Sequence, residues 1–212
     1  MTVGIIVQAR MTSKRFPGKV LAQLAGKPVL QRVLEQVKAV PGADLVICAY
    51  PAGEVSRPIE ALCKTLDVRT FAGDEHDVLG RYWLAAKENG LDVIMRCTAD
   101  CPFLEPSLCE KVLKLLLGDK NLDYTSNMYP TRTFPKGLDC EVFTWRCLDL
   151  THASTTQPYD REHVTPYMQR SNAFNRGLIS QDFDESEINL CVDYPEDIER
   201  IERLGKLSER GA

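Results

Sequence analysis

The chain has 212 residues, of which 44% are hydrophobic and 26% are charged, and its formal net charge is -4. This length suits one α/β domain, and the acidic balance disfavours a nucleic-acid partner. No apolar run approaches the roughly 20 residues of a membrane span, and no signal-peptide pattern is found. We therefore expect a cytoplasmic protein whose eight cysteines, none spaced as C-x-x-C, are reduced and mostly buried.

Strands and helices are predicted to alternate through the first half of the chain. Apolar runs typical of strands buried on both faces alternate with amphipathic helical patterns. In chain order we expect a strand at 3–7, a helix at 28–40, a strand at 45–50, a helix at 54–66, a strand at 68–73, a helix at 77–90, a strand at 92–99 and a helix at 106–118. This order predicts an α/β fold, a three-layer sandwich with a mainly parallel sheet. Ligands of such sheets bind at the carboxyl ends of the strands.

The pattern is less regular after residue 122. Strands are predicted at 123–127, 138–143, 176–180 and 188–192, and helices at 144–154, 161–170 and 194–210. No repeat, low-complexity segment or linker divides the chain. We therefore expect a single domain over 1–212, in which the second half completes the sheet and covers the site.

A basic loop, "VQARMTSKRFPGKV" at 7–20, directly follows the first strand. It contains Arg10, Lys14, Arg15 and Lys19. A strand, a turn with glycine and then a helix make a common phosphate cradle, although neither G-x-x-x-x-G-K-[ST] nor G-x-G-x-x-G is present. A solvated basic loop is the alternative. The position after a buried strand, in an otherwise acidic chain, favours binding of a nucleoside triphosphate.

Two aspartates follow predicted strands and could hold a metal ion. Asp100 comes after the strand at 92–99, and Asp193 comes after the run at 188–192. One or two carboxylates with substrate phosphates are the usual ligands of Mg²⁺. Each aspartate could instead be a cap or a turn residue, and Asp193 has capping-box spacing to Glu196.

Further polar residues could contact a second substrate. Asp139 and Glu141 would share one face of a strand, where they could bind sugar hydroxyls or simply face solvent. Arg161, beside His163, could meet a carboxylate or phosphate, or form an ion pair on a helix surface.

Several blocks of the chain resemble the bacterial sugar cytidylyltransferases, and most closely the branch of spore coat polysaccharide biosynthesis protein F. This family includes the synthetases that activate 3-deoxy-manno-octulosonate and acylneuraminates. The resemblance covers nearly the whole chain, with small departures at Phe16 and Tyr194. The blocks are "QARMTSKRFPGKVLAQLAGKPVL", "GDEHDVLGRYWLAAKENG", "VIMRCTADCPFLEP", "DYTSN", "FPKGLDCEVF", "REHVTPY" and "CVDYPEDIERI".

The resemblance implies a nucleotide-diphospho-sugar transferase (GT-A-like) fold, with CTP and a small sugar as substrates. About 125–175 would hold the sugar and form a homodimer contact, and Mg²⁺ would be bound by Asp100 and Asp193. The implied catalytic residues are Arg10, Lys19, Asp100 and Asp193. The implied nucleotide-binding residues are Ala9, Arg10, Ser13, Arg15, Gly18, Lys19, Asp77 and Arg81. The residues that we expect to bind the sugar, chosen from the residue patterns above, are Asp139, Glu141, Arg161 and His163.

We therefore expect transfer of CMP from CTP to an acidic sugar, or to a phosphorylated small sugar or polyol, for cell-surface polysaccharide biosynthesis. Two alternatives are open. A glycosyltransferase of the same fold would use a D-x-D motif, which "DFD" at 182–184 matches. A non-catalytic nucleotide-binding subunit of a polysaccharide-synthesis assembly would bind CTP without turnover.

Overall fold

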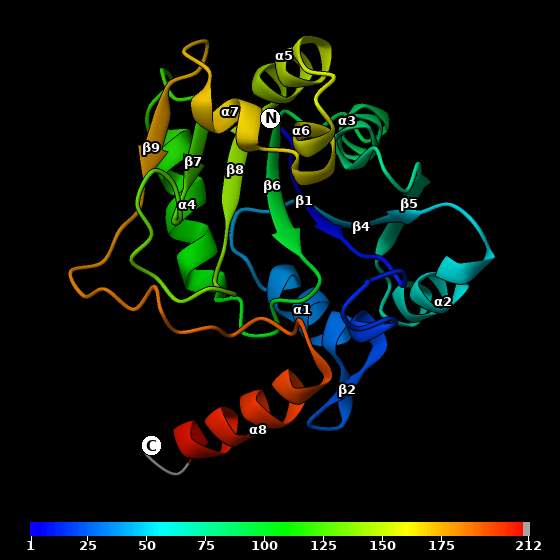
Figure 1. Ribbon diagram of the computed structural model, residues 1–212. Helices are drawn as coiled ribbons and strands as arrows, with labels where there is room; N and C mark the ends of the chain where they lie inside the picture. Colours follow the sequence, from blue (N-terminus) through cyan, green and yellow to red (C-terminus); the bar gives the residue numbers. More distant parts are fainter. Residues whose placement is uncertain (210–212) are drawn as a thin grey trace.

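The computed structural model describes residues 1–209 and has a seven-stranded sheet at its centre (Figure 1). Four neighbouring strands run parallel, in the order β5 (Arg69–Gly73), β4 (Leu45–Pro51), β1 (Val3–Gln8) and β6 (Val93–Thr98). Next to β6 lie β8 (Glu141–Thr144), β7 (Tyr124–Ser126) and β9 (Arg176–Leu178). β8 is antiparallel to both of its neighbours, whereas β7 and β9 are parallel to each other. The mainly parallel sheet that the sequence predicts is confirmed.

Helices cover both faces of this sheet. One face packs against α1 (Val29–Lys38), α2 (Arg57–Thr65) and α4 (Pro106–Gly118). The other face packs against α3 (Val78–Glu88), α5 (Trp145–Ser154) and α7 (Pro166–Arg170), with α6 (Pro158–His163) beside α3. The two hydrophobic cores on opposite faces give the predicted three layers.

The central strand β1 shows why the sequence folds in this way. Ile5 and Val7 lie in the core of one face, and Ile6 lies in the core of the other. Successive side chains of a strand point to opposite faces. A strand covered on both faces must therefore be apolar at every position, and these three side chains are fully buried.

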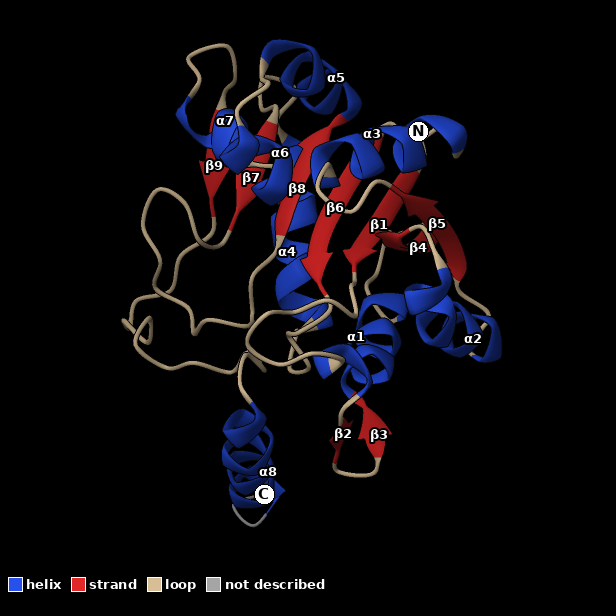
Figure 2. Ribbon diagram, turned by 45° about the vertical axis from the view of Figure 1, so that its right-hand side comes forward, coloured by secondary structure: helices blue, strands red, loops and turns tan. Residues whose placement is uncertain are grey.

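A β-hairpin and the last helix lie beyond the carboxyl ends of β1 and β6, as Figure 2 shows. The basic loop passes through the short helix η1 (Lys19–Leu21) into the hairpin of β2 (Gln23–Leu24) and β3 (Lys27–Pro28). The last helix, α8 (Pro195–Glu209), packs Ile201 against Leu24 and Val29 in a small third core. The last residue of the predicted helix, Arg210, lies outside the described residues. Among residues 1–209, no helix is long and apolar enough to cross a membrane.

Four predicted elements differ in the structure. Residues 188–192 form no strand and have one bridge, between Lys136 and Asn189, because the segment crosses the ends of the strands instead of joining the sheet edge. β8 begins at Glu141, so Asp139 lies before the strand. The predicted helix at 161–170 is divided into α6 and α7 at Val164, because its positive φ of 71° does not occur in an α-helix. The short helix η2 (Glu54–Ser56) precedes α2 within the predicted helix at 54–66.

Candidate active site

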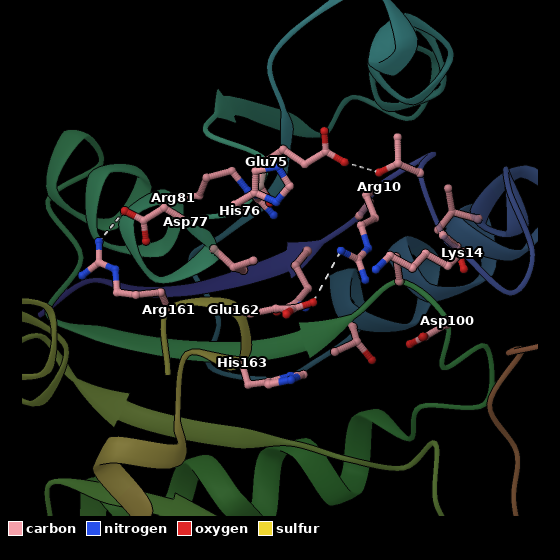
Figure 3. Close-up of a pocket in the computed structure, with 18 of the residues that line it drawn as sticks. Arg10, Lys14, Glu75, His76, Asp77, Arg81, Asp100, Arg161, Glu162 and His163 are labelled. Atoms are coloured by element: carbon pink, nitrogen blue, oxygen red, sulfur yellow. Dashed lines mark hydrogen bonds and ion pairs between the residues drawn. The ribbon is translucent and has the colours of Figure 1, made fainter. Parts of the chain in front are cut away.

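A cleft of about 1030 Å³ lies at the carboxyl ends of the parallel strands. Its walls come from the basic loop after β1, the segment after β5, residues 98–100 at the end of β6, and α6. Figure 3 shows Arg10 and Lys14 toward the Asp100 side of this cleft, and Arg161 beside Asp77 toward the other end. A parallel sheet is expected to bind ligands at this edge.

The basic loop is held in shape by its own backbone. The Gly18 amide donates to the Met11 carbonyl over 2.8 Å, which closes the loop before η1 begins. Gly18 has a φ of 73°, in the left-handed region that glycine adopts without steric cost. Gly18 therefore shapes the loop and does not line the cleft. The other predicted nucleotide-binding residues all line it, namely Ala9, Arg10, Ser13, Arg15, Lys19, Asp77 and Arg81.

Lys19 joins the two predicted metal-binding carboxylates. Its Nζ atom lies 2.6 Å from Oδ2 of Asp100 and 3.0 Å from Oδ1 of Asp193. Arg15 also contacts Asp193, at 2.5 Å. Burial disfavours the charged forms of Lys19 and Asp100, but the attraction between the two groups favours the charged forms more strongly. The pKa of Lys19 is therefore raised, and the pKa of Asp100 is lowered. Both groups are therefore charged at neutral pH.

This carboxylate pair fits a magnesium ion. Oxygens of Asp100 and Asp193 converge on the position of one cationic atom, the Lys19 ammonium nitrogen. Within residues 1–209 no group of three or more His, Cys, Asp or Glu side chains could hold a metal. Two carboxylates, with further oxygens from water and substrate phosphates, are what Mg²⁺ usually takes.

Asp77 and Arg81 form the wall of the cleft at the start of α3. Asp77 caps the helix, since its Oδ1 accepts a hydrogen bond of 2.9 Å from the Gly80 amide, and its Oδ2 pairs with Arg161. Arg81 is buried and donates to the carbonyls of Asp74 and Glu75, and burial lowers its pKa. Both side chains hold the segment after β5 in place.

Helix α6 supplies the facing wall. Arg161, Glu162 and His163 all line the cleft, and Glu162 lies 3.7 Å from Arg10 (Figure 3). The helix is anchored by the buried Asp160, whose carboxylate accepts hydrogen bonds of 2.6 Å from Thr155 and from Arg170. The predicted site residues do not include Glu162, Lys14, Glu75 or His76, which also line the cleft. The basic run already contained the signal for Lys14.

Replacing Asp160 by asparagine should reduce the acid sensitivity of the fold. Hydrogen bonds from Arg170, and then from Thr155, outweigh burial and hold the pKa of Asp160 below its ordinary value of 3.8. The stability that a lowered pKa supplies is complete above the ordinary pKa and is lost as the pH falls through the folded one. Asp160→Asn should lose about 2 kcal/mol near neutral pH and less in acid.

The measurement is urea unfolding of both proteins at neutral pH and near pH 3. Asp182→Asn, at an exposed position, is the matched control and should follow the wild type throughout. Equal losses for Asp160→Asn at both pH values would contradict the assignment.

The structure places Asp139 and Glu141 outside the cleft lining. Asp139 pairs with Arg132, with one bond at 2.9 Å. Glu141 is 1% exposed and lies in a network within the sheet, where it accepts hydrogen bonds from Arg96 at 2.5 Å and from Tyr124 at 2.6 Å. The expectation that the two carboxylates share one strand face is wrong, because the strand starts after Asp139. Their predicted contact with a sugar has no support from this geometry.

A basic loop that faces two carboxylates at the carboxyl ends of a parallel sheet is typical of nucleotide-binding α/β proteins. The family model described as "Cytidylyltransferase" matches residues 4–210. The chain therefore belongs to the cytidylyltransferase family, which is a family of nucleotidyltransferases. This match confirms the family that was predicted from the sequence.

Several known proteins are similar to this chain. The spore coat polysaccharide biosynthesis protein SpsF of Bacillus subtilis is 30% identical over 207 residues, which cover 94% of this chain and 84% of that protein. The uncharacterized protein MJ1063 of Methanocaldococcus jannaschii is 39% identical over 163 residues, which cover 77% of this chain and 65% of that protein. Among solved structures, a cytidylyltransferase from Leptospira borgpetersenii has a TM-score of 0.91 at 31% identity, covering 95% of this chain and 85% of that one. These likenesses agree with the nucleotidyltransferase fold predicted from the sequence.

Proposed function

We propose that this protein transfers CMP from CTP to an oxygen atom of a sugar or polyol acceptor and releases pyrophosphate. One observation carries the proposal: in a chain of the cytidylyltransferase family, Lys19 of the basic loop contacts both Asp100 and Asp193 across one cleft. A phosphate-binding loop and a carboxylate pair that fits Mg²⁺ thus meet at the same point.

The basic loop would bind the triphosphate. Arg10, Lys14, Arg15 and Lys19 all line the cleft, and together they match the roughly four negative charges of a nucleoside triphosphate. Lys19 and Arg15 are paired with carboxylates of the same site, so binding of the triphosphate would exchange these internal ion pairs for pairs with phosphate oxygens. The segment after β5, together with Asp77 and Arg81 at the start of α3, would form the wall beside the base.

The reaction is an in-line displacement at the α-phosphorus of CTP. A bond forms between this phosphorus and the acceptor oxygen as the bond to the leaving pyrophosphate breaks. Arg10 and Lys19 stabilise the negative charge on the leaving group, and the rigid loop positions the phosphates. Asp100 and Asp193 would hold Mg²⁺, which supplies charge neutralisation at phosphate oxygens when it is bound.

The acceptor in this proposal is an acidic sugar or a phosphorylated small sugar or polyol. Arg161 and His163 support this choice, because both line the cleft and can contact an anionic group. They belong to the segment 125–175, which would also form the homodimer contact. The name of the Bacillus subtilis relative supports a role in cell-surface polysaccharide biosynthesis. We propose that the protein carries out this role in the cytoplasm.

The alternative of a glycosyltransferase finds no support in the cleft. Asp182 and Asp184 of the "DFD" motif are exposed and lie outside its lining. A non-catalytic subunit would retain the basic loop but would need no carboxylate pair for a metal, and it would bind CTP without turnover.

A thermal-shift experiment with CTP, UTP, ATP and GTP tests the nucleotide. A ligand at about 100 times its Kd adds roughly 2.7 kcal/mol, which raises the Tm of a domain of this size by roughly 5 °C or more. We expect this shift for CTP and a larger one for CTP with Mg²⁺ than for CTP alone. The same shift with UTP, or none with CTP, would contradict the proposal.

Release of pyrophosphate from CTP then identifies the acceptor. The screen compares acidic sugars, sugar phosphates and polyol phosphates, with neutral sugars as controls. Release that depends on one of the anionic classes supports the proposal. CTP binding without release on any acceptor would favour the non-catalytic subunit.

A further inference from the structure

Two cysteines lie next to the carboxylate pair in the sequence. Cys101 follows Asp100, and Cys191 precedes Asp193 by two residues. Their Sγ atoms are 3.9 Å apart. The two segments are joined by a backbone hydrogen bond of 2.9 Å from the Val192 amide to the Asp100 carbonyl, so the sulfur atoms face each other between segments that are far apart in sequence.

This pair differs from the other cysteines in its exposure. All eight cysteines lie within the described residues, and Cys191 alone among them is partly exposed. Cys101 is 2% exposed and lies behind it. A small oxidant can therefore reach Cys191 from solvent. The Cys101 thiol then lies beside the oxidised sulfur of Cys191.

We propose that Cys101 and Cys191 form a reversible disulfide that lowers the activity of the adjacent site. The oxidant is a hydroperoxide. Hydrogen peroxide oxidises the Cys191 thiol to a sulfenic acid and is reduced to water, and the Cys101 sulfur then attacks the Cys191 sulfur and displaces a second water. Two thiols and one peroxide thus give one disulfide and two waters, and a small dithiol reverses the reaction by exchange.

The disulfide must disturb the neighbourhood of Asp100. The two sulfur atoms have to approach from 3.9 Å to about 2.05 Å. Either Cys101 or Cys191 must therefore move, and each is within two residues of a proposed metal-binding carboxylate. Cys101 also contacts Thr98 Oγ1 at 3.1 Å and donates to Asp100 Oδ1 at 3.6 Å. The disulfide removes the thiol hydrogen from these contacts and links the segments of Asp100 and Asp193 covalently.

Peptide mapping tests the disulfide without any assay of activity. Tryptic cleavage places Cys191 in the peptide 177–200 and Cys101 in the peptide 97–111, which also contains Cys97 and Cys109. After brief peroxide treatment we expect these two peptides to be linked, with the loss of two hydrogens. The link should be absent from Cys101→Ser and from Cys191→Ser. Persistence of the link in Cys101→Ser, or oxidation of Cys191 without a link, would overturn the proposal.

Turnover of CTP tests the regulatory effect, which rests on the proposed function. Peroxide should lower the turnover of the wild type on the order of tenfold to a hundredfold, as expected for a displaced active-site group, and a dithiol should restore it. Cys191→Ser should keep its turnover in peroxide. Cys63→Ala, in the buried core, is the matched control and should remain sensitive.

The two measurements fail in different ways. A linked peptide with unchanged turnover would overturn the regulatory effect. If no acceptor gave turnover in the reduced protein, the proposed function would fail, and the peptide map would still decide whether the disulfide forms.

Discussion

Replacing Asp100 by asparagine should lower the turnover of CTP by about a hundredfold or more, equivalent to about 3 kcal/mol in the barrier. Asp100 and Asp193 both contact the Lys19 ammonium, at 2.6 and 3.0 Å. Asparagine has nearly the same shape but no charge. The proposed magnesium site would lose one of its two carboxylates, and Lys19 would lose one of its two partners.

The measurement is pyrophosphate release at saturating CTP, together with circular dichroism and the unfolding midpoint of each variant. Asp193→Asn should lose turnover in the same way. Asp184→Asn is the matched control, because this exposed aspartate of the "DFD" motif lies outside the cleft lining, and it should retain turnover within about twofold of the wild type. Normal turnover of a folded Asp100→Asn protein would show that the metal assignment is wrong.

Replacing Glu141 by leucine should destabilise the fold by about 3–5 kcal/mol, because it leaves the guanidinium of Arg96 buried without its partner. The side chains of Arg96 and Glu141 are 12% and 1% exposed, and they are 2.5 Å apart. Burial opposes the charge on Arg96, but the Glu141 carboxylate outweighs it and raises the pKa of Arg96. Tyr124 also donates to Glu141 at 2.6 Å, and burial raises the pKa of its hydroxyl. The Tm should fall by roughly 10 °C or more.

A double variant separates structure from substrate binding at this position. Replacing both partners, Arg96→Met with Glu141→Leu, removes the unpaired charge and should recover most of the lost stability. Urea unfolding of the wild type, both single variants and the double variant completes the cycle. If Glu141 has the structural role that its burial indicates, turnover should recover with stability. A double variant that is stable but inactive would instead support the prediction that Glu141 contacts the sugar.

Much of the fold was predictable because the first half of the chain has clear periodicities. β1 and β4 are apolar at nearly every position, as strands covered on both faces must be, and α1 places its apolar side chains on one side. The run at 188–192 was wrongly predicted as a strand because it is mostly apolar, like β1 and β4. Only Val192 of this run is buried, and apolar character alone does not show whether a segment pairs with a sheet edge.

Much of the site was predictable because charge at the end of a buried strand has little structural purpose. Arg10, Arg15, Lys19, Asp100 and Asp193 were chosen on this basis, and they line one cleft. Asp139 and Glu141 were chosen by strand alternation, which gives the face of a side chain but not its partner. Arg96 and Arg132 determine where these two carboxylates lie, and no spacing in the sequence relates them.

Most of the order of strands and helices, the basic loop and the family can be predicted from the sequence alone, because each of these rests on local pattern. Which charges come into contact depends on the tertiary structure. It brought Lys19 between two aspartates from distant segments, enclosed Glu141 with Arg96, and set Cys101 against Cys191. Such contacts depend on how loops cross the ends of the strands, and they form only when the packed sheet holds those loops side by side.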